Sequence, residues 1–265
     1  MTYRRAPHPL YWLFTFLGGV VLLFIVAPLA GMVLHTSPPE IARTAADPEV
    51  YNSIFLTLWT SMAATLLMSL AAVPFAYLLA RREFPLKRLA LALVDLPITI
   101  PHSAAGIAIL GFISRDSLLG GAGERLGIRF VGGAAGIMVA MAFVSLPFLV
   151  NSARDGFAAV PERLEKVALS LGASPARVFF TISIPLAWRS ILSGLVLMWA
   201  RGLSEFGAVA IVAYHPMVTP VLIYERFGAF GLKYARPVSV VFLGVCLVVF
   251  LVARILGKPK YHAAR

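Results

Sequence analysis

The sequence has few charges and almost no cysteine. Only 13% of its 265 residues are Asp, Glu, Lys or Arg, whereas a soluble domain carries about 25%. The single cysteine, Cys246, lies inside an apolar run, so an intrachain disulfide and a cysteine-based metal site are both excluded. We expect it to be a small packing residue. Because 60% of the residues are hydrophobic, the chain is predicted to be an integral membrane protein with one compact membrane domain.

Catalytic signatures are also absent. The sequence contains no H-E-x-x-H, no G-x-S-x-G and no phosphate-binding G-x-x-x-x-G-K-[ST]. The net charge of +11 could indicate a nucleic-acid partner, but no basic run is interleaved with aromatic residues on a polar face. We therefore expect no enzyme activity, no metal and no cofactor in this chain, and no binding to nucleic acid.

Six apolar segments are predicted to be membrane-spanning helices. The first is an uncharged run that is long enough to cross about 30 Å of hydrocarbon and longer than the core of a signal peptide. A cleaved signal is the alternative for this run, but no clear small-x-small cleavage site follows it. The predicted spans are approximately residues 11–34, 51–80, 89–113, 131–150, 191–213 and 237–253.

The distribution of Lys and Arg predicts the orientation of these spans. With the N-terminus inside, 15 of the 23 basic residues lie on the inner side and 7 on the outer side, and Arg201 stays within a span. The sequence therefore predicts an all-α membrane protein with six spanning helices and with both termini on the cytoplasmic side of the cell membrane. We divide the chain into 1–50 (first helix and external loop), 51–256 (core, with a cytoplasmic loop at 151–185) and 257–265 (basic tail).

The polar stretch Val160–Pro185 separates two of these spans. Its first part has an apolar stripe with helical spacing, opposite a charged side. Gly172 is placed to end this helix in a left-handed conformation, and Ser174-Pro175 to begin a second short helix. Pro185 is expected to close the unit. The stripe is Leu164, Val167, Ala168 and Leu171, and the opposite side is Glu162, Arg163, Glu165, Lys166 and Ser170. An amphipathic connector resting on lipid is the alternative interpretation.

This stretch resembles the EAA loop of the permeases of ATP-binding cassette (ABC) importers. The resemblance is carried by Glu165-Lys166-Val167-Ala168, then Gly172, then Ile182-Ser183-Ile184-Pro185, although Lys166 and Val167 stand where the family has Glu and its first Ala. It implies a coupling helix, Pro161–Pro175, seated in a groove of a cytosolic ATPase. The implied coupling residues are Glu162, Glu165, Lys166, Ala168, Leu171, Gly172, Ala173, Ser174, Pro175, Ile182 and Pro185.

The third span carries several polar residues and two prolines. Pro97 and Pro101 are expected to break or kink its helix, which a membrane tolerates where backbone lines a cavity or is buried in protein. Thr99, His102 and Ser103 could then donate hydrogen bonds to an anion. The alternative for His102 is that its ring nitrogens form hydrogen bonds with a neighbouring helix and take no part in binding an anion. Asp95 could equally anchor the helix or repel anions at the exit.

The fifth span contains Arg201 and Glu205, four residues apart on one predicted helix face. An ionisable group inside a span usually faces protein or a water-filled path. We expect Arg201 and Glu205 to form a structural ion pair with each other, in preference to contacting a substrate directly. Together with Ser204 and the polar groups of the third span, this pair is the predicted translocation path.

Both spans resemble the permeases of tungstate and molybdate importers. The resembling segments are Asp95–Gly106, Arg201–Val209 and Ala213–Phe227, and the likeness extends over the chain from about residue 50. It implies a homodimer, two cytosolic ATPases that hold ATP and Mg²⁺, and an external protein that delivers the oxyanion. Sulfate or thiosulfate permeases remain the alternative within this class. The alternative from another class is an ion-gradient-driven transporter that uses Asp95, His102, Arg201 and Glu205 as a relay.

Overall fold

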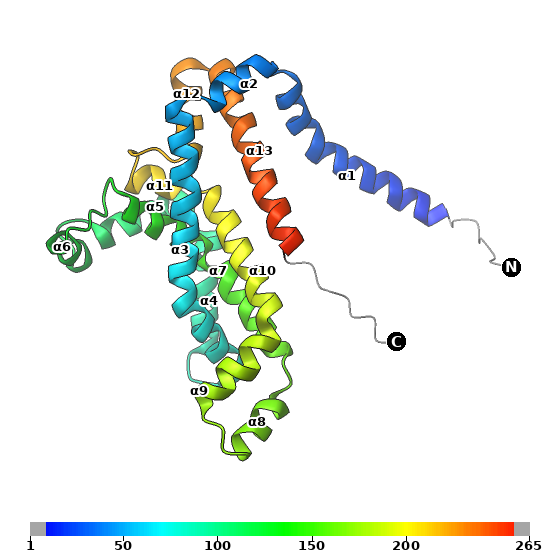
Figure 1. Cartoon of the computed structure of the whole chain (residues 1–265), viewed down its shortest axis with the longest axis vertical. Helices are drawn as coiled ribbons and strands as arrows, with labels where there is room; N and C mark the ends of the chain where they lie inside the picture. The colour runs from blue at the N-terminus through cyan, green and yellow to red at the C-terminus, as the bar shows by residue number, and fades with distance from the viewer. Residues whose placement is uncertain (1–8, 257–265) are drawn as a thin grey trace.

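The computed structural model describes the backbone of residues 9–256 and the side chains of residues 10–251, so the predicted basic tail lies outside the described residues. All regular structure in this part is helical (Figure 1). The helices are α1 (Pro9–Leu34), α2 (Pro38–Ala45), α3 (Pro48–Arg81), α4 (Lys87–Thr99), α5 (His102–Ile113), α6 (Leu118–Arg125), α7 (Ala134–Ala159), α8 (Glu162–Ser170), α9 (Pro175–Val178), the π-helical η1 (Phe179–Ser183), α10 (Ile184–Leu203), α11 (Gly207–Val212), α12 (Thr219–Phe230) and α13 (Leu232–Leu256).

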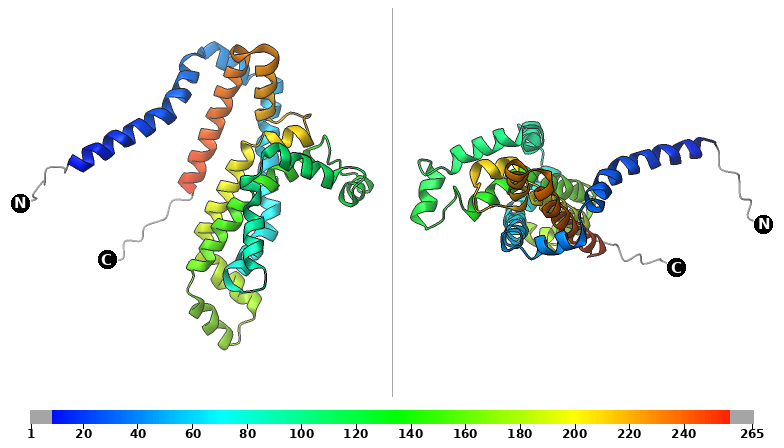
Figure 2. Two further views of the ribbon diagram at one scale, coloured as in Figure 1. Left: turned by 180° about the vertical axis from the view of Figure 1, so that it is seen from behind. Right: turned by 90° about the horizontal axis from the view of Figure 1, so that it is seen from above.

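The core is a bundle in which α7 packs along both α3 and α10 and also against α4 (Figures 1 and 2). Small residues bring these helices close together. A Cβ on Gly156 would lie 2.4 Å from the Ser190 Cβ, and one on Gly194 would lie 2.9 Å from the Ser152 Cβ. Such contacts are how helices associate in lipid, where no hydrophobic force drives them together. Around them the side chains of Leu79, Phe157 and Met198 are fully buried or nearly so.

Five of the described helices are long and apolar enough to cross a membrane, namely α1, α3, α7, the continuous α9–α10 helix and α13. The pair α4 and α5 makes a sixth candidate only if its 114° bend is counted within one span. The predicted break of the third span is confirmed, because α4 ends at Thr99 and the chain is extended at Ile100 before Pro101. The two prolines remove backbone donors at this point.

Helix α1 stands away from the bundle in all the views of Figures 1 and 2. None of its most apolar stretch is buried. Its C-terminal end leads into α2, and in the turn between them the backbone carbonyl of His35 accepts a hydrogen bond from Arg236 of α13 at 2.5 Å. Nearby, Arg226 of α12 forms ion pairs of 2.7 Å with both Asp47 and Glu49. These contacts join the α2–α3 corner to α12 and α13.

The prediction of a continuous fifth span, residues 191–213, is wrong. Helix α10 ends at Leu203, and a separate short helix, α11, begins at Gly207. Between them the Glu205 carboxylate accepts a hydrogen bond from the Ala208 N–H at 2.9 Å. The side chain thus satisfies a donor that has no partner at a helix start, which makes the break stable inside the protein.

Pro185 also differs from its predicted role as the end of the loop. It lies in the first turn of α10, and the helix is continuous from Pro175 to Leu203. Proline normally clashes with the carbonyl four residues earlier. Here the preceding turn is π-helical, with the Ile184 N–H bonded to the Phe179 carbonyl, so the hydrogen bonds shift by one residue just before the proline.

Candidate functional site

The corner between α8 and α9 has the predicted geometry. Gly172 follows α8 with a φ of +87°, and the Ser174 side chain accepts a hydrogen bond from the Arg177 N–H at the start of α9. The Ala173 N–H bonds back to the Ala168 carbonyl at 3.0 Å, which caps α8. A Cβ on Gly172 would meet nothing within 4 Å, so the backbone conformation alone favours glycine there.

The apolar stripe of α8 is exposed in the single chain. Leu171 is 83% exposed and Val167 is 55% exposed, and Leu164 is also exposed. Beside them Glu162 and Lys166 form an exposed ion pair of 2.9 Å along the helix. A protein surface seldom carries a projecting apolar stripe of this kind unless another surface covers it.

Glu165, which the sequence places on the charged side of α8, is the one buried residue of this helix. Its carboxylate receives two nearly parallel hydrogen bonds from Arg81, from Nη2 to Oε1 at 2.9 Å and from Nε to Oε2 at 3.0 Å. Ser183 donates to Oε1 at 2.9 Å, and the Tyr77 hydroxyl donates to Oε2 at 3.2 Å. We call Tyr77, Arg81, Glu165 and Ser183 the Glu165 cluster.

The Glu165 cluster joins three parts of the chain. Tyr77 and Arg81 belong to the last turns of α3, Glu165 to α8, and Ser183 to the π-turn that leads into α10. Arg81 also donates to the Val160 carbonyl at 2.9 Å, where α7 has just ended. A bidentate arginine–carboxylate pair fixes orientation as well as distance. The loop is therefore held in one orientation relative to the ends of α3, α7 and α10.

Electrostatics keep the Glu165 carboxylate charged. Burial favours the neutral acid, but the hydrogen bonds from Arg81 and Ser183 outweigh it, so the pKa of Glu165 is lowered below its ordinary value. The ionised carboxylate therefore stabilises the folded chain. This contribution is fully present above the ordinary pKa of a glutamate, and it is lost only as the pH falls through the lowered pKa of the folded state. At neutral pH the cluster is therefore an intact ion pair.

Aromatic rings surround the Glu165 cluster on its inner side. Tyr77 packs edge-on against Phe157 of α7 at a centroid distance of 5.2 Å and against Phe179 of η1 at 5.0 Å. Phe157 is completely buried. Such edge-to-face pairs add about 0.5–1.5 kcal/mol each beyond their buried area. Polar and aromatic contacts together make a firm connection between the loop and the helix bundle.

A second polar group lies where α5, the end of α10 and α11 meet. Arg201 Nη2 and His102 Nδ1 each lie 3.0 Å from Oε2 of Glu205, which is fully buried. Arg201 Nη2 is also 2.9 Å from His102 Nε2. The predicted ion pair is thus confirmed, and His102 contacts a neighbouring helix as the more conservative interpretation expected. We call His102, Arg201 and Glu205 the intramembrane triad.

The other predicted path residues are arranged differently. Ser204 is exposed and contacts Arg201, with its oxygen 3.3 Å from Nη1. Ser103 follows His102 and is exposed, whereas the Thr99 hydroxyl donates to the Leu96 carbonyl of its own helix. Asp95 accepts a hydrogen bond from Asn151 of α7 at 2.6 Å, so it anchors α4. Asn151 was not among the residues that the sequence suggested.

Glycines hold the intramembrane triad in place. Gly207 of α11 lies so close to α5 that a Cβ there would be 2.7 Å from the His102 Cβ, and a Cβ on Gly106 would be 3.0 Å from the Ala208 Cα. We expect Gly207→Ala to lower the free energy of unfolding by about 1–3 kcal/mol through overpacking. The melting temperature of the purified protein measures this. Gly111→Ala in α5 is the control, because its Cβ would meet nothing within 4 Å, and an equal loss in both variants would contradict the packing argument.

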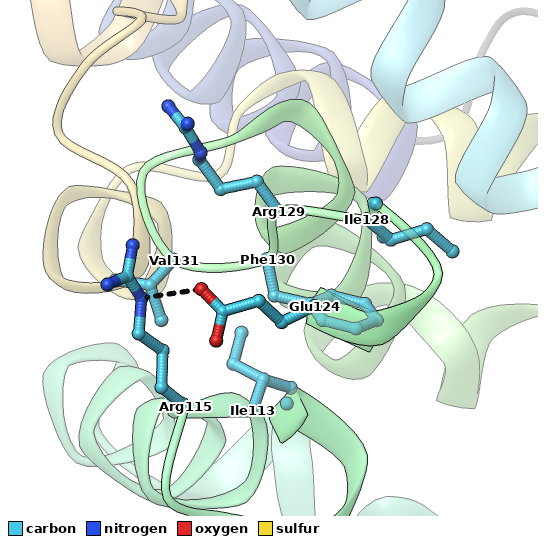
Figure 3. Close-up of a pocket in the computed structure, with 9 residues that line it drawn as sticks. Ile113, Arg115, Glu124, Ile128, Arg129, Phe130 and Val131 are labelled. Carbon is cyan, nitrogen blue, oxygen red and sulfur yellow. Dashed lines mark ion pairs between the residues drawn. The ribbon is translucent and has the colours of Figure 1, made fainter. Parts of the chain in front are cut away.

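A cavity of about 220 Å³ lies apart from both groups, between the end of α5, α6 and the following loop (Figure 3). Arg115 and Glu124 face each other across it and form an ion pair with an Nε–Oε1 distance of 3.3 Å. Both side chains are more than half exposed, so this pair adds little stability. None of the predicted site residues lines this cavity.

Relatives of known type align with almost the whole chain. It is 42% identical over 254 residues to a protein of Pyrococcus abyssi named molybdate/tungstate transport system permease protein WtpB, covering 94% of this chain and 96% of that protein. The protein of the same name from Thermococcus kodakarensis is 43% identical, with 97% and 99% covered. The sulfate transport system permease protein CysT of Synechocystis is 30% identical, with 90% and 86% covered.

Solved structures share the fold at low sequence identity. A chain of a bacterial ABC transporter involved in the import of the acidic polysaccharide alginate superposes with a TM-score of 0.71 at 17% identity, covering 95% of this chain and 96% of that one. A chain of the MetNI methionine ABC transporter gives 0.61 at 14% identity, covering 84% and 98%. Residues 72–258 match the family described as binding-protein-dependent transport system inner membrane component, and the chain belongs to that family.

Proposed function

We propose that this chain is the permease subunit of an ATP-driven importer of a tetrahedral oxyanion, molybdate or tungstate. The identity of 42–43% over nearly the full length to permeases with that name carries the proposal. The sulfate permease, at 30%, is more distant. Sulfate remains the second substrate, because it has the same shape and charge.

The exposed stripe on α8 supports a cytosolic ATPase as partner. Helices α8 and α9 lie at one end of the molecule (Figure 1), and Leu164, Val167 and Leu171 are exposed there. We assign Pro161–Pro175 as the segment that docks into the ATPase, and we assign ATP and Mg²⁺ to that partner. With both termini inside, as the basic residues predict, this end of the bundle faces the cytoplasm.

The Glu165 cluster supplies the route by which docking moves the spans. When ATP draws two ATPase subunits together, each docked loop is displaced with its partner. The bidentate Arg81–Glu165 pair passes that displacement to α3, and the Ser183–Glu165 hydrogen bond passes it to α10. Both helices then tilt with the loop, and the path alternates between inward-open and outward-open states.

The uncovered surface of α1 supports a second copy of this chain as a further partner, together with lipid. Its apolar side chains from Tyr11 to Leu34 are largely exposed, and within its own chain the helix makes only a few contacts, with α13. We place the anion path on the axis between two copies. We propose an external oxyanion-binding protein as a further partner, and the family description, which names a binding-protein-dependent transport system, supports a binding protein in general.

Competition for uptake tests the substrate. Proteoliposomes that hold this chain, its ATPase and its binding protein would be loaded with ATP and given labelled molybdate. We expect uptake that unlabelled tungstate suppresses and that a hundredfold excess of sulfate leaves nearly unchanged. Equal suppression by sulfate would move the assignment to the sulfate branch, and a failure of both labelled molybdate and labelled sulfate to enter would refute the oxyanion proposal.

A further inference from the structure

The three members of the intramembrane triad differ in exposure. The Glu205 side chain is fully buried, whereas that of Arg201 is 22% exposed and that of His102 is 40% exposed. Glu205 is also fixed from behind by the Ala208 N–H. The carboxylate is therefore hidden, and the cationic and imidazole members present the accessible side. A purely structural ion pair does not require this asymmetry.

Arg201 has donors to spare. A guanidinium carries five N–H groups. Nη2 lies 3.0 Å from Glu205 Oε2 and 2.9 Å from His102 Nε2, and Nη1 donates to the Ser204 oxygen at 3.3 Å. The Nε–H and the second Nη1–H have no acceptor among the described residues. A guanidinium that is held in place and has free N–H groups can bind a carboxylate, a phosphate or another oxyanion through these groups.

Hydroxyl and imidazole groups adjoin these donors. Ser204 is exposed, and its own O–H donates to the Arg201 carbonyl at 3.1 Å, a bond within one turn that can be exchanged for a ligand. The His102 ring lies against both partners, with Nδ1 3.0 Å from Glu205 Oε2 and Nε2 2.9 Å from Arg201 Nη2, so it is positioned beside the guanidinium. The close packing at Gly207 leaves the His102 backbone little room to shift.

We propose that Arg201, with Ser204 and His102 beside it, is a contact site for a tetrahedral divalent oxyanion within the permease. Glu205 is its positioning residue: it orients the guanidinium and cancels its charge, so that an anion is held weakly enough to leave. This proposal rests on the proposed function, because an anion must pass through the chain. It assigns a ligand-binding role to residues whose ion pair would otherwise have only a structural role.

Protection of a cysteine tests the site directly. Cys246 is first replaced by Ala, and Ser204→Cys is introduced into the permease assembled with its ATPase in liposomes. The rate of labelling by a cationic methanethiosulfonate is measured with molybdate or with chloride at equal ionic strength. We expect molybdate to slow labelling at least threefold. Adding Arg201→Gln should abolish the protection, whereas Arg154→Gln, in another arginine ion pair of the bundle, should keep it.

Each outcome decides the matter. Equal labelling rates in molybdate and chloride would overturn the site, and so would protection that survives Arg201→Gln. A cysteine at the fully exposed Leu118 controls for direct effects of molybdate on the reagent, since its rate should not change. The assay needs neither ATP nor the binding protein. A lack of protection therefore counts against this site alone, and a lack of ATP-driven uptake counts against the proposed function.

Discussion

Replacing Glu165 with Gln is expected to lower ATP-driven uptake at least tenfold while the ATPase stays bound. The amide keeps the size of the side chain but removes the charge that Arg81 faces at 2.9 Å in a site where both side chains are 9% exposed. Leaving one member of such a buried pair uncompensated costs about 3–5 kcal/mol. The loop then keeps its docking stripe but loses its fixed orientation relative to α3 and α10. Uptake and ATP hydrolysis would be measured on the same liposomes.

The matched control for this variant is Glu124→Gln, which removes a carboxylate charge from an ion pair outside the docking segment. Glu124 pairs with Arg115, but both side chains are more than half exposed, so the pair contributes little. We expect uptake within twofold of the unmodified protein. If Glu165→Gln transported at the normal rate, or if it simply failed to bind the ATPase, the cluster would not be the connection between loop and spans.

Replacing Leu171 with Asp is expected to weaken binding of the ATPase by at least a hundredfold. Leu171 is 83% exposed in the single chain, next to the glycine corner, and burying a leucine contributes about 1.5–3 kcal/mol. The substitution removes that contribution and adds the cost of burying a carboxylate. Because the side chain touches little of its own chain, the fold should be unaffected. Retention of the ATPase during purification, followed by titration in detergent, measures the effect.

Leu118→Asp provides the comparison for Leu171→Asp. Leu118 is 97% exposed, but it lies on α6, far from α8 in Figure 1. The same change in chemistry there should leave ATPase binding intact. Normal binding by the Leu171 variant would show that the exposed stripe rests on something other than the ATPase, such as the lipid surface. The Glu165 variant tests whether movement of the loop is passed to the spans, and the Leu171 variant tests whether the loop binds the ATPase.

The corner of the loop could be predicted because its signals are local. Gly172 followed by Ser174-Pro175 specifies a helix end and a helix start within a few residues, and both are found. The break in the third span follows from Pro97 and Pro101 in the same way. Each of these features depends on backbone chemistry at the residue itself, which needs no knowledge of distant partners.

The inward position of Glu165 could not be read from the sequence. Helical periodicity treats the apolar side of a helix as the buried one, but α8 leaves that side uncovered and buries its carboxylate instead. The partners responsible are Arg81, 84 residues earlier, and Ser183, 18 residues later. In the sequence, Arg81 is simply one of the basic residues that follow an apolar run, and only the folded chain brings the two together.

The interruption at Glu205 escaped prediction for a related reason. Residues 191–213 are apolar enough for one span, and Arg201 and Glu205 have the spacing of a helical pair. Their ion pair does form, but Glu205 also caps α11 through the Ala208 N–H, so the helix ends between them. Pattern alone cannot distinguish a side chain that bonds along a helix from one that ends it.

The most direct test of the whole account is the energy source of transport. Proteoliposomes with this chain, its ATPase and its binding protein would be assayed for molybdate uptake with and without ATP on the ATPase side, and with and without an uncoupler. The account predicts uptake that requires ATP and continues when ion gradients are collapsed. Uptake that proceeds without ATP and stops with the uncoupler would contradict it, and would make the polar residues of α4, α5 and α10 the relay of a gradient-driven transporter.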